Sequence, residues 1–348
     1  MKAYILGTGR SGTTLLYVLM QEIMSDNCRG EPHFYYEPFL RDIGLLDGRY
    51  DSVAAKMDLQ ESLSIEGMYQ HLRLPLFVVD PAPFLDNSYL RSLFDPADGR
   101  PDLLIKFIRA NGRFLLLRAI CPQAKALFII RNPLDVVNSI RQRFSFFGRE
   151  FHRDDFPRFS AEAKRIYPED FPPTAPETDV ERELLFWYFM NRFALESFAG
   201  TPAAERPLLI CYEEFGRDGE RAIKELCLFL DVPYREKYLA TARRKAGTVT
   251  RTFLLAESEQ SLFREYLQKY LALLREYAIK STVVVEDVLA KYRLAEHPVD
   301  PPKRFPGLHV RALEREYESL LIMMGASQKE KAKPTAEAGR SSRGREKK

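Results

Sequence analysis

Two glycines near the start of the chain have the spacing of a phosphate-binding loop. Gly7 and Gly12 are separated by four residues, and Thr14 fills the Ser/Thr position of the pattern G-x-x-x-x-G-K-[ST]. Such a loop, set between a strand and a helix, aims backbone N–H groups at one spot where an anion binds. The lysine that reaches the β- and γ-phosphates of a nucleoside triphosphate is replaced here by Thr13. The loop therefore predicts anion binding without ATP or GTP hydrolysis, with Arg10 as its cation. The alternative is an ordinary strand-to-helix turn.

A second anion position is indicated after the most apolar strand of the sequence. Arg131 follows the run 126–130, and a helix is expected to begin at Pro133. Ser139 lies eight residues after Arg131, about two helical turns further on. An arginine fork and a serine hydroxyl together can hold a phosphate. The alternative is that Arg131 is only a surface charge after a strand.

Three further charged residues fall near predicted strand ends. Lys106 interrupts the apolar run 103–108, and a buried lysine is costly unless it is paired or faces a charged ligand. Glu31 and Glu37 each precede a proline, which favours extended backbone. Ligands of parallel α/β sheets bind beyond the carboxyl ends of the strands, so we expect these side chains in one cleft. Solvated loop acids are the alternative for either glutamate.

The elements that position these residues alternate between strands and helices. Apolar runs at 2–6, 103–108, 126–130 and 208–212 predict strands, and helical segments separate them. This alternation predicts an α/β fold, with a mostly parallel central sheet flanked by helices on both faces. The aromatic helix expected over 181–198 carries Trp187, and its aromatic residues are expected to belong to the core.

One domain is expected over residues 1–324. Within it, residues 145–180 have poor periodicity and predict a lid or binding loop. Residues 325–348 contain almost no apolar side chains, so a disordered basic tail is expected there.

Composition excludes several classes of protein. The 348 residues carry a formal net charge of +3, which indicates neither a general nucleic-acid binder nor a strongly acidic protein. The four cysteines lie far apart, so neither a zinc site nor a disulfide scaffold is expected, and no metal is predicted. No run reaches the ~20 apolar residues that span a bilayer, and no signal peptide precedes the first strand. These features predict a cytoplasmic protein; they do not indicate an oligomeric state.

In several ordered blocks the sequence resembles the sulfotransferase family, whose donor is 3′-phosphoadenosine 5′-phosphosulfate (PAPS). Residues 9–15 resemble its 5′-phosphosulfate loop, and Arg131-Asn132-Pro133 with Ser139 resembles its 3′-phosphate motif. Tyr212-Glu213-Glu214 resembles a strand end at which the tyrosine lies by the adenine, and residues 105–109 resemble the segment before the 3′-phosphate strand. The resemblance covers roughly residues 1–255.

The resemblance implies sulfuryl transfer from PAPS to the hydroxyl of a carbohydrate, small molecule, lipid or peptide, with PAP as product and no metal required. Arg10 and Lys106 would stabilise developing charge, and Glu37 would act as general base. The residues implied in donor binding are Gly9, Arg10, Ser11, Gly12, Thr13, Thr14, Arg131, Ser139, Tyr212, Arg244 and Lys245.

The sequence departs from the cytosolic small-molecule branch of that family. No histidine lies between His71 and His152, so the catalytic histidine of that branch has no counterpart. Tyr36-Glu37-Pro38 resembles instead the Glu-Pro of membrane-bound carbohydrate and protein-tyrosine sulfotransferases, with Glu31 as a rival for the same role. Residues 244–247 only loosely resemble the family's Arg-Lys-Gly loop. A P-loop nucleotide or small-molecule kinase and a non-catalytic PAP-binding module remain the alternatives.

Overall fold

The computed structural model describes residues 1–24, 28–29, 72–95, 102–143, 156–246, 257–281 and 283–293. The chain divides into two units, Met1–Asp300 and Pro301–Lys348, and every described residue belongs to the first. Glu31, Glu37, the first part of the predicted lid (145–155) and the predicted tail lie outside the described residues.

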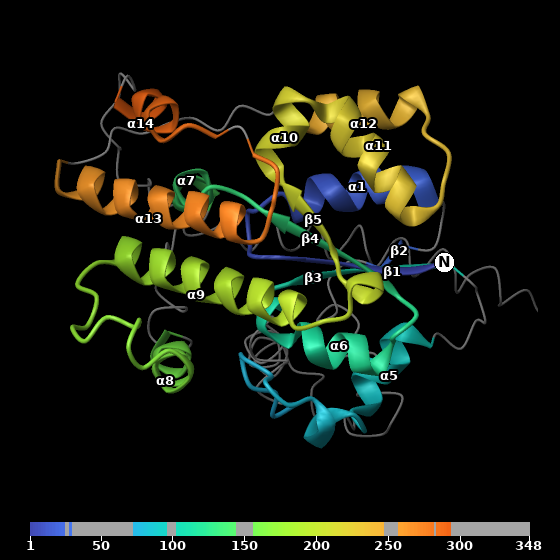
Figure 1. Ribbon diagram of the computed structural model, residues 1–348, viewed down its shortest axis with the longest axis horizontal. Helices are drawn as coiled ribbons and strands as arrows, with labels where there is room; N and C mark the ends of the chain where they lie inside the picture. The colour runs from blue at the N-terminus through green and yellow to red at the C-terminus, as the bar shows by residue number, and fades with distance from the viewer. Residues whose placement is uncertain are drawn as a thin grey trace, which may run out of the picture. The chain divides into compact units, whose positions relative to one another are not determined.

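A five-stranded parallel sheet forms the centre of the described part (Figure 1). Its strand order is β2-β3-β1-β4-β5, with β1 in the middle. The strands are β1 (Lys2–Gly7), β2 (Cys28–Arg29), β3 (Leu103–Ile108), β4 (Lys125–Ile130) and β5 (Leu208–Cys211). All four predicted strands are confirmed, and β2 is the addition. In β1 the five residues from Ala3 to Gly7 are buried, as a strand covered on both faces requires.

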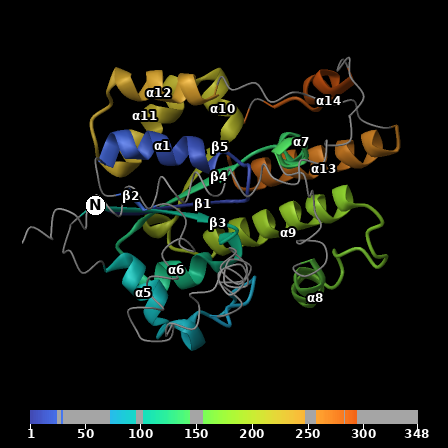
Figure 2. The ribbon, with the colours of Figure 1, turned by 180° about the vertical axis from the view of Figure 1, so that it is seen from behind.

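Helices cover both faces of this sheet, which confirms the predicted α/β fold (Figures 1 and 2). The helices are α1 (Thr13–Met24), α5 (Ser88–Phe94), α6 (Phe114–Ile120), α7 (Pro133–Arg143), α8 (Phe156–Ile166), α9 (Asp179–Ala199), α10 (Tyr212–Arg217), α11 (Gly219–Leu230), α12 (Glu236–Ala246), α13 (Glu257–Glu276) and α14 (Val285–Arg293). Among the described residues, no helix is long and apolar enough to cross a membrane.

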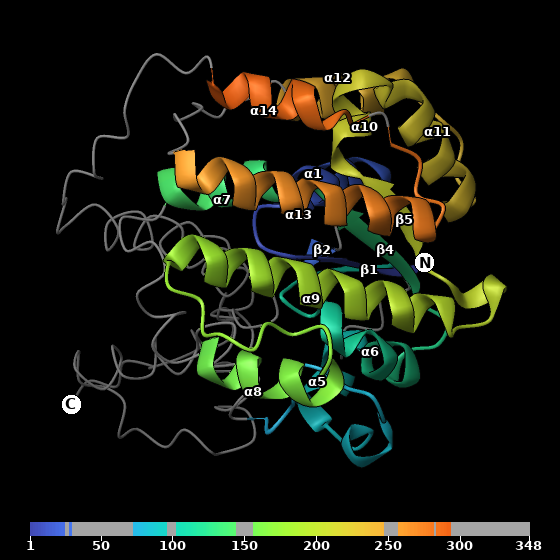
Figure 3. The same ribbon diagram turned by 60° about the vertical axis from the view of Figure 1, so that its left-hand side comes forward.

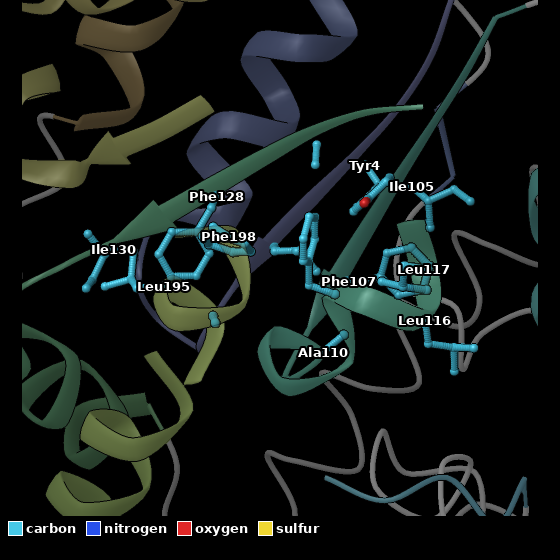
Figure 4. Packing of buried hydrophobic residues seen from close by; sticks show 14 of the residues in the cluster. Tyr4, Ile105, Phe107, Ala110, Leu116, Leu117, Phe128, Ile130, Leu195 and Phe198 are labelled. Carbon is cyan, nitrogen blue, oxygen red and sulfur yellow. The ribbon is translucent and has the colours of Figure 1, made fainter. Parts of the chain in front are cut away.

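Alternation along the strands separates two cores. On one face, Ala3 and Ile5 of β1 pack with Leu16 and Leu19 of α1. The opposite face is shown in Figure 4, where the ring of Phe128 lies beside Phe198 of α9, 5.0 Å between ring centroids. Because the sheet is held from both sides, the positions of its strand ends are fixed.

The segment expected to be a long loop contains α8. Its Phe159 is completely buried and packs 5.1 Å from Phe186 of α9, centroid to centroid. Pro157 lies in the first turn of α8, where a proline is compatible with a helix. Trp187 is also buried, so the expectation that the aromatic residues of α9 belong to the core is confirmed. Figure 3 shows α9 beside α13, which also packs against α7 and α14.

Candidate functional site

The loop between β1 and α1 is a tight turn at the carboxyl edge of the sheet. β1 ends at Gly7 and α1 begins at Thr13. Arg10 has a φ of 68° and Gly12 a φ of 102°, both in the left-handed region. A Cβ atom on Gly12 would lie 2.7 Å from Cε2 of Tyr212, so the turn requires glycine at this position.

Hydrogen bonds within the loop hold its shape. The backbone N–H and the hydroxyl of Ser11 both donate to the carbonyl of Thr8, at 3.2 and 2.7 Å. Ser11 and Thr13 are buried, whereas Thr14 is exposed at the start of α1. Since the first N–H groups of a helix have no partner within it, the loop and the first turn of α1 form a position suited to an anion.

Arg131 joins this loop to the end of β4. Its guanidinium lies over the ring of Tyr212, with Cζ 4.2 Å from the ring centroid. Nη1 donates to the carbonyl of Arg10 at 3.3 Å, and Nη2 donates to Oδ2 of Asp135 at 3.3 Å. The arginine is therefore held by three neighbours, and its buried Nε–H has no hydrogen-bond partner among the described residues.

Ser139 completes the contact between the two predicted anion positions. It lies on α7, is buried, and its Oγ accepts a hydrogen bond of 2.8 Å from Nε of Arg10. The loop and the Arg131–Ser139 pair, predicted as separate sites, thus adjoin. Tyr212 lies between them, packed on Gly12 and under Arg131.

Asp135 is a residue of this site that sequence reasoning missed. It accepts hydrogen bonds from Lys291 at 3.0 Å and from the hydroxyl of Tyr292, both on α14. Burial alone would raise the pKa of its carboxyl, but the charges of Arg131 and Lys291 and the hydrogen bonds lower it to about 2. Its spacing of four residues from Arg131 is a helical ion-pair signal that could have revealed it. No comparable signal pointed to α14.

Glu213 joins the ends of the neighbouring strands β4 and β5 through hydrogen bonds. Its Oε1 accepts from the backbone N–H and the side-chain amide of Asn132, at 2.8 and 2.7 Å. Its Oε2 accepts from the hydroxyl of Tyr270 on α13 at 2.9 Å. Glu213, which follows Tyr212, thus holds Asn132, which follows Arg131. These hydrogen bonds fix the backbone next to Tyr212 and Arg131, whose side chains are stacked.

Lys106 lies on the α1 face of β3. It is partly buried, and its Nζ is 5.5 Å from the ring centroid of Tyr17, one helical turn after Thr13. Its neighbour on β1 is Ile5. The lysine therefore extends along the helix whose first turn belongs to the loop.

Of two other predicted donor-binding residues, one has no described contact with this cluster and the other has no described side chain. Arg244 is exposed on α12, and no hydrogen bond or ion pair joins it to another described residue. The side chain of Lys245 lies outside the described residues, as do Glu31 and Glu37. Among the described residues, no group of three or more His, Cys, Asp and Glu side chains is arranged to hold a metal ion.

A buried carboxyl group lies on α9. Glu183 is only 8% exposed, and the positive charge of Arg109 acts on its carboxyl group. Arg109 follows β3, and its backbone N–H donates to the carbonyl of Gly7 at 3.3 Å. Burial raises the pKa of Glu183 to about 7, while Arg109 opposes the shift and Asp179 adds to it.

We expect Glu183→Gln to make the fold more stable at alkaline pH. The folded-state pKa of about 7 lies above the ordinary value of 4.5, so the wild type loses stability as the pH rises through this interval. The gain from the substitution should therefore grow by about 2 kcal/mol between pH 5 and pH 8. Urea unfolding at both pH values measures it, with the exposed Glu169→Gln as control. A gain that does not change with pH would contradict the expectation.

Taken with the parallel sheet, the loop and the Arg131–Ser139 pair define an α/β protein in which the two predicted anion positions adjoin at one sheet edge. The family model described as "Sulfotransferase family" matches residues 3–236, and the chain belongs to this family. The family predicted from the sequence blocks is thereby confirmed. Helices α13 and α14 lie beyond the matched residues.

Similar solved structures are also sulfotransferases. Mouse sulfotransferase SULT7A1 complexed with PAP is 15% identical, with 84% of this chain and 89% of that chain covered and a TM-score of 0.37. Sulfotransferase STF9 from Mycobacterium avium is 14% identical, with coverage of 80% and 75% and a TM-score of 0.40. The sulfotransferase domain of the Synechococcus PCC 7002 olefin synthase is 15% identical, with coverage of 80% and 95% and a TM-score of 0.35. No curated protein matches the chain.

Proposed function

We propose that the protein transfers a sulfuryl group from PAPS to a hydroxyl group of an acceptor and releases PAP. The observation that carries this proposal is the hydrogen bond between Arg10 and Ser139, which brings the two anion positions together. Two adjoining positions suit a nucleotide with phosphates on both its 3′ and 5′ sides. The unused, buried Nε of Arg131 supports the fit, because such a donor gains a partner when a phosphate binds.

The donor is proposed to lie across the loop. The backbone N–H groups of residues 9–14 and the hydroxyls of Thr13 and Thr14 would hold the 5′-phosphosulfate. Arg131 and Ser139 would hold the 3′-phosphate. Tyr212 carries Arg131 on its ring, so its first role would be to position the arginine, with contact to the adenine along its remaining edge. Arg244 and Lys245 stay candidates for the 3′-phosphate from the end of α12.

The proposed reaction is an in-line displacement at sulfur. The acceptor hydroxyl oxygen forms a bond to sulfur, and the bond between sulfur and the 5′-phosphate oxygen breaks. Glu37 would take the hydroxyl proton, and the leaving oxygen departs with PAP. Arg10 and Lys106 would stabilise the charge that develops on the transferring group and the leaving oxygen. The acceptor belongs to the hydroxyl-bearing class, with carbohydrates, small molecules, lipids and peptides as candidates.

Calorimetric titration with PAP, without magnesium, tests the proposal against ATP as control. We expect PAP to bind and Arg131→Ala to weaken it about 10- to 100-fold, because hydrogen bonds to a charged group contribute about 1.5–3 kcal/mol. Arg131→Lys keeps the charge without the fork and should fall between the two. Arg118→Ala removes an arginine that pairs with Glu205 away from the site, and should bind PAP like the wild type.

The same titration separates the competing functions. Magnesium-dependent binding of ATP, or no binding of PAP, would overturn the proposal and favour a kinase. PAP binding without transfer from labelled PAPS to any acceptor of a broad hydroxyl panel would indicate a binding module instead.

A further inference from the structure

Helix α14 reaches the proposed 3′-phosphate position from the C-terminal end of the described chain. Nζ of Lys291 lies 3.0 Å from Oδ1 of Asp135, and Nη2 of Arg131 lies 3.3 Å from Oδ2 of the same carboxylate. The ammonium and the guanidinium therefore flank one carboxylate. Tyr292, the next residue of α14, also donates to Oδ1 and fixes the helix there.

Arg131 and Lys291 differ in the exposure of their side chains to solvent. The side chain of Arg131 is 11% exposed, whereas that of Lys291 is 46% exposed. An ammonium group has three donors, and the contact with Asp135 uses one of them. The open side of Lys291 can therefore bind an incoming anion without giving up its carboxylate partner.

The charges around this position do not cancel. Arg10, Arg131 and Lys291 contribute three positive charges, against the two negative charges of Asp135 and Glu213. The carboxylate of Glu213 accepts hydrogen bonds from the neutral side chains of Asn132 and, on α13, Tyr270. Since the pKa of Asp135 is lowered to about 2, it stays ionised at neutral pH and the balance stays positive. Such an excess favours a dianionic ligand group.

We propose that Lys291 is a further donor-binding residue, which contacts the 3′-phosphate of PAPS and PAP from the side opposite Arg131. This inference rests on the proposed function and deepens it, because it adds to the nucleotide site a helix that lies outside the matched part of the family. Asp135 is then a positioning residue, because its two carboxylate oxygens each hold one of the two cations, Arg131 and Lys291. Lys291 also makes the protein discriminate PAP from nucleotides without a 3′-phosphate.

Nucleotide titrations of the full chain test this role. PAP is compared with AMP, which lacks the 3′-phosphate, using the wild type and Lys291→Met, which keeps the length of the side chain without its charge. We expect Lys291→Met to weaken PAP binding about five- to thirtyfold, the range of one partly exposed charged contact, and to leave AMP binding unchanged. Lys291→Arg should recover most of the affinity for PAP.

Two controls separate a ligand contact from a structural role. Lys269→Met removes a lysine on α13 that pairs with Glu265, and should leave PAP binding unchanged. Tyr292→Phe removes the other contact between α14 and Asp135 without changing charge, and its effect on PAP should be smaller than that of Lys291→Met. Melting temperatures show whether each variant folds.

Several outcomes would overturn the inference. The first is a PAP affinity of Lys291→Met equal to that of the wild type. The second is an equal loss of affinity for PAP and for AMP in Lys291→Met. The third is a loss of PAP affinity in Tyr292→Phe as large as that in Lys291→Met. A wild type that binds no PAP would overturn the proposed function itself, and the inference with it, so the two failures are distinguishable.

Discussion

Gly12→Ala is expected to abolish PAP binding and to lower the melting temperature of the protein. The φ of 102° at Gly12 is strained for any residue with a Cβ atom, at a cost of about 1–3 kcal/mol. The new methyl group would also overlap the Tyr212 ring and lie 3.2 Å from Cδ1 of Ile129. Tyr212 has little room to retreat, because Arg131 lies over its ring at 4.2 Å. The substitution therefore displaces both anion positions together.

Matched substitutions separate this effect from a general cost of replacing glycine. Gly216→Ala places a methyl group in α10 with no atom within 4 Å, so PAP affinity should match the wild type. The melting temperature should stay equal or rise, because alanine favours a helix more than glycine does. Gly9→Ala lies in the same loop, and its nearest neighbour would be Cγ2 of Ile108 at 3.8 Å, so its stability should change little. Thermal unfolding and PAP titration of the three variants provide the measurement. A Gly12→Ala variant as stable as Gly9→Ala would show that the loop adapts.

The features that could be predicted from the sequence are those set by neighbours along the chain. The two glycines specify a tight turn, and the apolar runs specify strands that are buried on both faces. Arg131 could be assigned to a strand end because the polar residues after 126–130 interrupt a buried run. Ser139 could be assigned to the same cleft because helix geometry relates it to Arg131. These relations join residues that are close together in the sequence, and they are found in the structure.

The features that could not be predicted depend on contacts between distant parts of the chain. Nothing in the sequence pairs Arg10 with Ser139, 129 positions away, although the motifs predict that both bind anions. Lys291 and Tyr292 reach Asp135 only because α13 places α14 beside α7. Such contacts follow from helix packing, which the local pattern of a short amphipathic helix does not specify.

Lys106 shows how far the role of a single residue could be predicted from the sequence. Its interruption of a buried strand signalled a special environment, and the structure places its ammonium near the ring of Tyr17. An aromatic face attracts a cation and lowers the cost of partial burial. A lysine that binds the leaving oxygen once the donor is present could make the same contact with Tyr17. The role of Lys106 at the leaving oxygen therefore stays a prediction.

The largest expected effect on the rate of transfer belongs to Glu37. We expect Glu37→Gln to lower kcat by about 10²- to 10⁴-fold, because the amide cannot take the proton of the acceptor hydroxyl. The Kd for PAP should stay unchanged, since the donor positions are assigned to the loop, Arg131 and Ser139. Transfer from labelled PAPS to an acceptor found in the hydroxyl panel measures the rate, and calorimetry measures the Kd.

Glu31→Gln is the matched control, because it makes the same change at the other Glu-Pro step. β2 ends at Arg29 and runs parallel to β3, and both glutamates come after this strand in the sequence. The rates of the two variants therefore decide which glutamate is the base. Loss of turnover in Glu31→Gln with full turnover in Glu37→Gln would move the base to Glu31. Full turnover in both would overturn the assignment of the base to either glutamate.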